Sequence, residues 1–297
     1  MSILLISRNV CIKVKQFIFW CKLKLMEDLE IIAFRSRILT ILTAWKCGSG
    51  HLSSSLSLIE ILVALFAKKY SNNNEKKVRI VLSKGHAALG FYSVLSQFGL
   101  IDAKELKTYN MNDSRLGSHT SRKSLHDVEF SAGSLGMGLG FGCGLAQAEQ
   151  INSTSNKIFV LLGDGECNEG SIWESANYAA ANNLSNLVAI IDSNKVQAVA
   201  RASDLLGDST LGNTFSAFGW EVVEINGHNF KEIEQALAIK STKPLAIVAH
   251  TVAGKSFPLF ENQVSWHYSN PADIDIQTYI QITGANKVAQ DLIDLFQ

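Results

Sequence analysis

The amino-acid sequence predicts an α/β fold in which a parallel sheet carries helices on both faces. Short apolar runs rich in β-branched residues alternate along the chain with segments of helical character. The chain has 297 residues, of which 47% are apolar and 18% charged, and this suits a compact soluble protein with a substantial core. The expected strands are Val78–Leu82, Ile158–Leu162, Leu187–Ile191, Glu221–Ile225 and Leu245–Ala249, and the expected helices are Ser57–Lys69, Ala87–Phe98, Leu135–Gln150, Gly170–Asn182 and Phe230–Ile239.

Both ends of the chain carry further segments. Residues 1–25 are apolar but interrupted by basic side chains, so they fall short of the ~20 apolar residues of a membrane span. We expect them to be an N-terminal extension, either poorly ordered or upstream of the true start, with a membrane or targeting role as the alternative. A fresh helix start with acids in its first turn follows at Met26, and one domain is expected over residues 26–297 because no repeat or long linker interrupts them. The tail from Pro271 to Gln297 is expected to form a short loop and one helix that packs back on the body.

The charge and the cysteines limit the classes of partner. Lys plus Arg and Asp plus Glu number 27 each, and this balance predicts neither nucleic-acid nor membrane binding. The five cysteines have no CxxC spacing and suggest neither a disulfide framework nor a zinc site. A reducing, cytoplasmic location is therefore expected.

The segment FVLLGDGECNEGSIWE indicates a ligand site after a strand. Its apolar run leads into Gly163-Asp164-Gly165, and a helix is expected to begin near Gly170, where free N–H groups favour a phosphate. A second apolar run ends at Asn194, 30 residues after Asp164, which is enough for a crossover helix and the next strand. A carboxylate, an amide oxygen and the backbone carbonyl of Val196 are therefore expected to meet one cation such as Mg²⁺.

The stretch GDGECNEG…IDSNKV resembles the signature of thiamine-diphosphate enzymes, and over residues 39–270 the chain is similar to the amino-terminal part of transketolase. The resemblance implies the thiamine-diphosphate-binding fold. It also implies that Asp164, Asn194 and the Val196 carbonyl hold Mg²⁺ or Ca²⁺. Gly165, Glu166 and Asn194 are then expected on the diphosphate of the cofactor.

Four histidines lie in glycine- or serine-rich surroundings and match motifs of the same family. The resemblance implies that His51 touches the hydroxyls of the substrate, that His86 of SKGH lies near the diphosphate, and that His119 faces the donor sugar. His267, in the late WH pair, is expected near both diphosphate and substrate. Imidazoles suit these roles because they transfer protons near neutral pH and donate to oxygen atoms. The other three histidines are interpreted as structural: His126, His228 and His250.

The glycine-rich run GSLGMGLGFGCGLA is expected to form a tightly packed helix with its amino end toward phosphate. By resemblance, Gly133 and the Leu135 carbonyl contact the cofactor. Glu169 corresponds to a glutamate at the family's dimer contact, part of a proposed proton link between two sites; helix N-terminal capping is the alternative. Two departures concern the substrate: Leu52-Ser53-Ser54 replaces Pro-Gly-Gly after His51, and Thr120 replaces a proline after His119.

The resemblance implies transfer of a two-carbon ketol group from a ketose to an aldose, with phosphorylated sugars as substrates. In the family, the glutamate that activates the aminopyrimidine lies on a second, pyrimidine-binding domain. Because the chain ends near the end of the first family domain, we expect a separate carboxy-terminal subunit, joined in an α2β2 heterotetramer. Alternatives are a relative in specialised sugar biosynthesis, the α-subunit of a 2-oxo-acid decarboxylase or dehydrogenase, and a non-catalytic relative.

Overall fold

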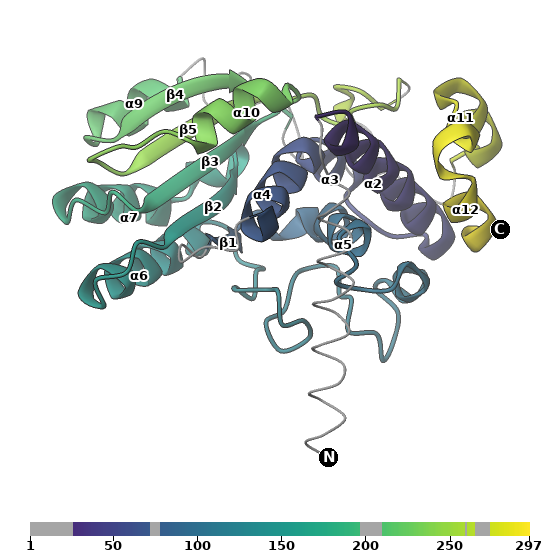
Figure 1. Ribbon diagram of the computed structural model, residues 1–297, viewed down its shortest axis with the longest axis horizontal. Coiled ribbons are helices and arrows are strands. Elements are labelled where there is room, and N and C mark those ends of the chain that lie inside the picture. Colours follow the sequence, from purple (N-terminus) through teal and green to yellow (C-terminus); the bar gives the residue numbers. More distant parts are fainter. Residues whose placement is uncertain (1–25, 72–77, 197–209, 259, 265–273) are drawn as a thin grey trace.

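The computed structural model describes residues 26–71, 78–196, 210–258, 260–264 and 274–297. These residues form a parallel sheet of five strands in the order β1-β2-β3-β5-β4 (Figure 1). The predicted sheet is thereby confirmed, and each expected strand lies within an observed one. The strands are β1 (Val78–Leu82), β2 (Lys157–Gly163), β3 (Leu187–Ser193), β4 (Glu221–Asn226) and β5 (Leu245–His250).

The sheet is buried on both faces over β1, β2, β3 and β5, whose successive side chains enter opposite apolar layers, whereas the edge strand β4 is partly exposed. On β2, Phe159 and Leu161 belong to one buried cluster, whereas Val160 and Leu162 belong to the other. This arrangement explains why the strands read as continuous apolar runs and lack the alternation of a half-exposed sheet.

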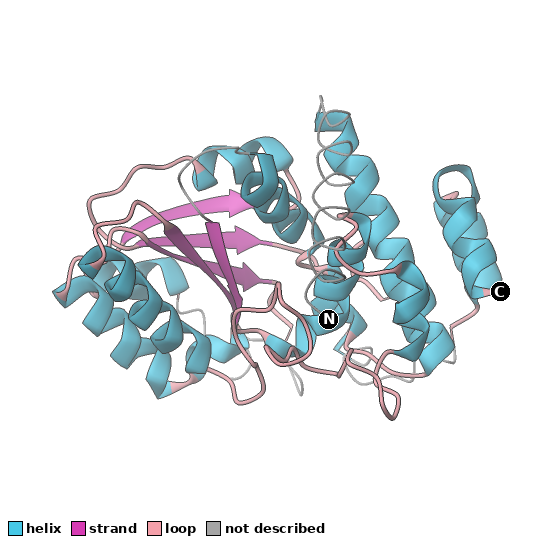
Figure 2. Cartoon of the chain, turned by 60° about the horizontal axis from the view of Figure 1, so that its bottom comes forward, coloured by secondary structure: helices cyan, strands magenta, loops and turns pink. Residues whose placement is uncertain are grey.

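Helices cover both faces of the sheet, as the sequence predicts (Figure 2). One layer consists of α6 (Met137–Ile151), α7 (Gly170–Ala181) and α9 (Leu211–Ala217). The other contains α2 (Met26–Cys47), α3 (Leu52–Leu56), α4 (Ile59–Ser71), α5 (Ala88–Gln97) and α10 (Phe230–Leu237). Short 3₁₀ turns are η1 (Gly85–Ala87), η2 (Ala103–Thr108) and η3 (Gly165–Asn168). No helix among these described segments has the length and apolar character needed to cross a membrane.

The carboxy-terminal tail corrects one expectation, because two helices are present where one was predicted. They are α11 (Ile276–Thr283) and α12 (Asn286–Phe296), of which α12 packs against α2 (Figure 1). Gly284, with φ of +65°, ends the first helix in the left-handed conformation that glycine adopts readily. The tail packs back on the body as expected, with Phe296 fully buried and Arg35 of α2 bound to Asp291.

Candidate functional site

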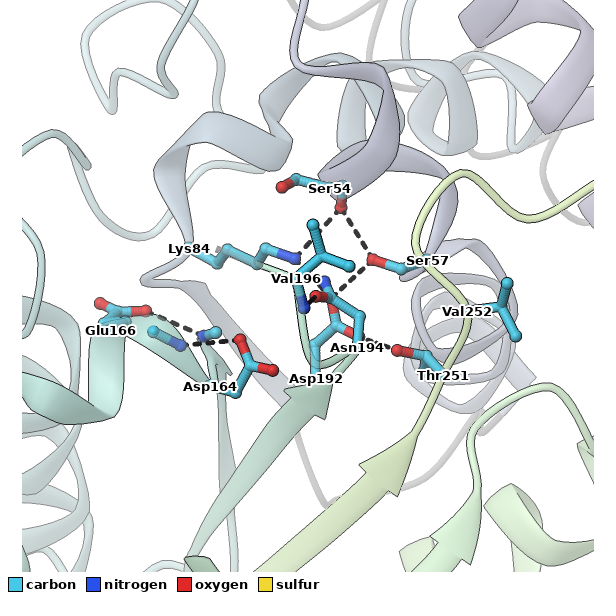
Figure 3. Close-up of polar contacts among 12 residues, drawn as sticks. Ser54, Ser57, Lys84, Asp164, Glu166, Asp192, Asn194, Val196, Thr251 and Val252 are labelled. Atoms are coloured by element: carbon cyan, nitrogen blue, oxygen red, sulfur yellow. Dashed lines mark hydrogen bonds and ion pairs between the residues drawn. The ribbon is translucent and has the colours of Figure 1, made fainter. Parts of the chain in front are cut away.

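The carboxyl ends of β2 and β3 bring the two predicted metal ligands together. These strands pair with Gly163 opposite Asp192, and the Asp164 N–H donates to the Asp192 carbonyl at 3.2 Å. The Asp164 carboxylate accepts the Lys195 N–H, directly after Asn194, at 2.7 Å. Both predicted side chains therefore lie at one edge of the sheet (Figure 3). This is the edge at which open α/β sheets bind ligands.

The Asn194 side chain is held in one orientation by its neighbours. Its amide nitrogen donates to the Asp192 carboxylate at 3.2 Å, and its amide oxygen accepts the Val196 N–H at 3.0 Å. The nitrogen is thus directed toward an acid, and the oxygen, which has a second lone pair, lies on the side of Val196. The side chain is 4% exposed, so this orientation is fixed inside the protein.

The Asp164 carboxylate is buried beside backbone donors. It accepts the N–H groups of Gly165, at 2.7 Å, and of Lys195. Burial raises the pKa of Asp164 to about 6, and the neighbouring Asp192 carboxylate adds to the rise. Lys84 and the two N–H groups offset part of it. A carboxyl group with a raised pKa is one whose negative charge is incompletely compensated by its surroundings.

A buried acid that the sequence analysis did not single out connects four segments at this edge. Asp192 is 0% exposed and accepts from Ser57 Oγ at 2.6 Å, from Lys84 Nζ, from Asn194 and from Thr251 Oγ1. These donors follow α3, β1, β3 and β5 (Figure 3). Asp192 ends an apolar run in the sequence, which is a signal, but its partners are far apart along the chain.

Three of the four predicted histidines gather around the turn after β1. The rings of His51 and His86 meet edge to face, with centroids 5.7 Å apart. A Cβ atom on Gly85 would lie 3.1 Å from Cδ2 of His119, so this third imidazole borders the same turn. His267 lies outside the described residues. The turn itself is fixed to the sheet because the Lys84 N–H donates to the Leu161 carbonyl of β2 at 3.0 Å.

The glycine-rich segment forms α6, but its first amide groups have internal partners. The Gly136 N–H donates to the Glu166 carboxylate at 2.9 Å, and the Gly138 N–H donates to Ser83 Oγ at 3.1 Å. These two amides are thus occupied by groups of the protein itself. Gly133 is exposed, and a Cβ atom there would have no neighbour within 4 Å, which leaves open space beside it.

Other predicted positions differ in their environment. Leu135 is half-buried just before α6. The Glu166 side chain, predicted on the cofactor, is buried and contacts groups of this chain. Glu169 is exposed at the N-cap position of α7, and its side chain makes no capping bond, so capping does not explain this residue.

The two departures from the resembled motifs are buried. Leu52, Ser53 and Ser54 are each 3% exposed in the first turn of α3. Thr120 is 2% exposed, and its hydroxyl donates to the Phe130 carbonyl at 3.3 Å. The residues that depart from the family motifs are therefore packed inside the protein directly after His51 and His119.

Comparisons with known proteins agree with this geometry. The family described as transketolase, thiamine diphosphate binding domain, matches residues 30–297. An apulose-4-phosphate transketolase subunit of Actinobacillus succinogenes is 34% identical over 252 residues, covering 82% of this chain and 91% of that protein. A 6-deoxy-6-sulfo-D-fructose transketolase subunit of a Clostridium species is 35% identical over 249 residues, covering 81% and 90%.

Full-length transketolases match over a smaller share of their own length. Human transketolase is 34% identical over 274 residues, which cover 89% of this chain and 44% of that protein. The crystal structure of transketolase from Campylobacter jejuni superposes with a TM-score of 0.77 and 29% identity, covering 90% of this chain and 46% of the other. The chain thus spans less than half of these proteins.

The parallel sheet and the strand-end site define a thiamine-diphosphate-binding fold of the α/β class. The chain belongs to the transketolase family and contains that family's thiamine-diphosphate-binding domain, so it is a transferase of the transketolase type. The resemblance seen in the sequence is confirmed. A 2-oxo-acid decarboxylase or dehydrogenase subunit is not favoured by these relatives.

Proposed function

We propose that this chain is the amino-terminal subunit of a split transketolase. Together with a carboxy-terminal subunit, it transfers a two-carbon ketol group from a ketose to an aldose. The observation that carries this proposal is the adjacent placement of Asp164 and Asn194 at the ends of β2 and β3. It occurs in a chain that matches two transketolase subunits over about nine-tenths of their length.

The donor set supports a divalent cation, Mg²⁺ or Ca²⁺, held by Asp164, Asn194 and the Val196 carbonyl. All three offer oxygen, which hard cations prefer. A cation would compensate the Asp164 carboxylate, whose pKa burial raises to about 6. Asp192 engages the Asn194 amide nitrogen, so the metal would meet the amide oxygen, which accepts the Val196 N–H and has a second lone pair. Diphosphate oxygens and water would complete the coordination.

Bound thiamine diphosphate supplies a thiazolium carbon that attacks ketones and stabilises the two-carbon unit after C–C cleavage. The residues of this chain hold and orient it. Gly133, Leu135 and Gly165 would hold the diphosphate, and the cation at Asp164 and Asn194 would neutralise part of its charge. His51 and His119, beside His86, are suited to donate to sugar hydroxyls or to transfer protons near neutral pH.

We infer that the partner is a separate subunit carrying the pyrimidine-binding domain, in an α2β2 assembly. Support comes from the relatives that are named as transketolase subunits and match this chain over nearly their full length. The exposed Glu169 is then available for a contact between subunits. Without the second subunit, half of the cofactor pocket would be open to water, so the isolated chain should bind the cofactor weakly.

A specialised ketose is the second candidate for the substrate, beside the common sugar phosphates. Two relatives are named for apulose 4-phosphate and 6-deoxy-6-sulfo-D-fructose. The Leu52-Ser53-Ser54 segment, which departs from the family motif directly after His51, also supports a sugar other than the common pentose phosphates. A screen of ketose and aldose pairs with the mixed subunits would identify donor and acceptor.

The decisive experiment is a titration of thiamine diphosphate into the mixed subunits with and without Mg²⁺, followed by calorimetry and turnover. We expect metal-dependent binding in the wild-type complex and its loss in Asp164→Ala, because that variant removes the anionic ligand. Glu234→Gln, on the exposed side of α10, is the matched control and should bind as the wild type does. Full turnover by Asp164→Ala at limiting Mg²⁺ would show that the metal assignment is wrong.

A further inference from the structure

Glu166 is a buried acid whose carboxylate contacts three separate loops at the candidate site. It lies in η3, directly after β2, and is 2% exposed. One carboxylate oxygen accepts from Ser83 Oγ and from the Gly136 N–H at 2.9 Å. The other accepts from the Gly163 N–H at 3.1 Å. The three donors come from the turn after β1, the start of α6 and the end of β2.

Ser83 extends this contact into the first turn of α6. Its hydroxyl donates to Glu166 and accepts the Gly138 N–H at 3.1 Å. A Cβ atom on Gly138 would lie 2.3 Å from the Ser83 side chain, so the helix and the turn touch without room for a larger residue. Glu166 therefore binds the Gly136 amide directly and is connected to the Gly138 amide through Ser83.

Gly136 is fixed from its other side as well. Its φ of +79° is left-handed, and the Ser171 hydroxyl of α7 donates to its carbonyl at 3.1 Å. A Cβ atom at this position would lie 2.7 Å from the Cβ atom of Glu169. The peptide before α6 is therefore clamped between the Glu166 carboxylate and the start of α7.

We propose that Glu166 is a positioning residue that locks the turn of His86, the loop of Gly133 and Leu135, and the loop of Asp164 into one rigid cofactor cradle. The inference rests on the proposed function, since these are the loops expected around the diphosphate. A carboxylate is required because donors approach both of its oxygens. An amide at this position offers one acceptor oxygen, and its NH₂ group would face a backbone donor.

The test is Glu166→Gln in the full-length chain, examined by hydrogen–deuterium exchange without ligand and by titration with magnesium pyrophosphate. We expect faster exchange in residues 83–88, 133–140 and 163–168 together, with β4 and β5 unchanged. Affinity for magnesium pyrophosphate should fall roughly tenfold, because the loops must be ordered on binding and a buried donor loses its acceptor.

Two controls make the result interpretable. Ser83→Ala removes only the hydroxyl that joins Glu166 to the Gly138 N–H. Exchange should therefore become faster in residues 83–88 and at the Gly138 amide, and the Gly163 amide should stay protected. If Glu166→Gln does not fold, this exchange pattern in Ser83→Ala tests the inference. Glu234→Gln should change neither exchange nor affinity. Faster exchange confined to residues 163–168, or unchanged pyrophosphate affinity in Glu166→Gln, would overturn the inference. The titration is made with the mixed subunits, because the isolated chain is expected to bind weakly. If the wild-type complex binds no magnesium pyrophosphate, the proposed function fails, and the exchange pattern of the ligand-free chain decides the role of Glu166.

Discussion

At the residue scale, Lys84 and Asp192 form a buried ion pair at the candidate site. Lys84 is 2% exposed and Asp192 is 0% exposed, and the same carboxylate orients the Asn194 amide. Burying the two charges costs solvation free energy, and the hydrogen bonds that Asp192 accepts from Ser57, Asn194 and Thr251 offset part of that cost. The pair therefore does more for the placement of Asn194 than for overall stability.

Removing one member of this pair should be severe. Lys84→Met keeps the bulk of the side chain but leaves the Asp192 carboxylate buried without its cation, so we expect the free energy of unfolding to fall by about 3–5 kcal/mol. Urea denaturation measures the change, and Lys231→Met on exposed α10 is the control. The double variant Lys84→Met/Asp192→Asn should lose less than the two single losses combined, whereas simple additivity would contradict the coupling.

A second buried acid gives a pH-dependent prediction. Glu60 of α4 contacts Arg37 and the Nδ1 atom of His228, whose Nε2 accepts the Val252 N–H at 2.8 Å. Burial alone would raise the pKa of Glu60, but Arg37 and His228 lower it below its ordinary value of 4.5. The unfolded chain thus takes up this proton at a higher pH than the folded chain, so the stabilisation is present above pH 4.5 and is lost as the pH falls through the folded pKa.

Glu60→Gln should therefore cost about 3 kcal/mol of unfolding free energy near pH 7, because it leaves Arg37 buried and unpaired. The difference between wild type and variant should shrink as the pH falls below 4.5. Urea denaturation at a series of pH values checks this, with Glu234→Gln as a matched carboxylate that is exposed. A difference that does not change with pH would contradict the assigned role.

At the scale of elements, the glycines of α6 differ in whether their surroundings leave room for a side chain. Gly142 faces β2, and a Cβ atom there would lie 2.5 Å from Val160 Cγ2. Gly144, two residues on, is exposed, and a Cβ atom at that position would have no neighbour within 4 Å. The helix therefore packs closely on the sheet through one side only.

This asymmetry predicts opposite effects for one substitution. Gly142→Ala should lower the free energy of unfolding by about 1–3 kcal/mol, because the added methyl group overpacks the contact with β2. Gly144→Ala should raise it by up to about 1 kcal/mol, because alanine favours the helix and meets no obstacle. Thermal and urea unfolding of the two variants side by side measure the contrast. Equal effects of the two variants would mean that α6 does not pack as described.

At the scale of the whole molecule, the candidate site lies at one edge of the sheet and is built from segments distant in sequence. The single carboxylate of Asp192 accepts hydrogen bonds from residues that lie before α4, after β1 and after β5. The carboxy-terminal helices also pack on distant segments. The helix α12 contacts α2, and Tyr279 of α11 stacks on Phe257 with ring centroids 4.8 Å apart. The edge is thus a product of the complete fold of the described residues.

The proposed split assembly leads to a prediction about affinity. The isolated chain should bind thiamine diphosphate at least about tenfold more weakly than the chain mixed with its companion subunit, because the second subunit encloses the other half of the cofactor. Calorimetric titration of both samples at the same Mg²⁺ concentration provides the comparison. Equal affinities, or ketose turnover by the isolated chain, would contradict the split site.

Sequence periodicity was sufficient for the sheet and for most helices. Four of the five described strands read as apolar runs because the sheet is buried on both faces there, and the 30-residue spacing from Asp164 to Asn194 predicted adjacent strand ends. The break at Gly284 was missed, since an apolar helical pattern continues through it and only its left-handed conformation shows the end of α11. The sequence also did not indicate that Leu52, Ser53 and Ser54 are buried in the first turn of α3.

The amino-acid sequence by itself determined the fold class, the family and the two strand-end residues, because these depend on local pattern and on fixed crossover geometry. Only the tertiary structure decided which groups complete the site. Asp192 contacts Ser57 and Lys84, which are 135 and 108 residues away in the sequence, and Ser83 contacts Gly138, which is 55 residues away. No local sequence pattern encodes such pairings. Burial then decides the roles of Asp192 and Glu166, since an acid enclosed among donors orients its neighbours, whereas the same acid at the surface would only be solvated.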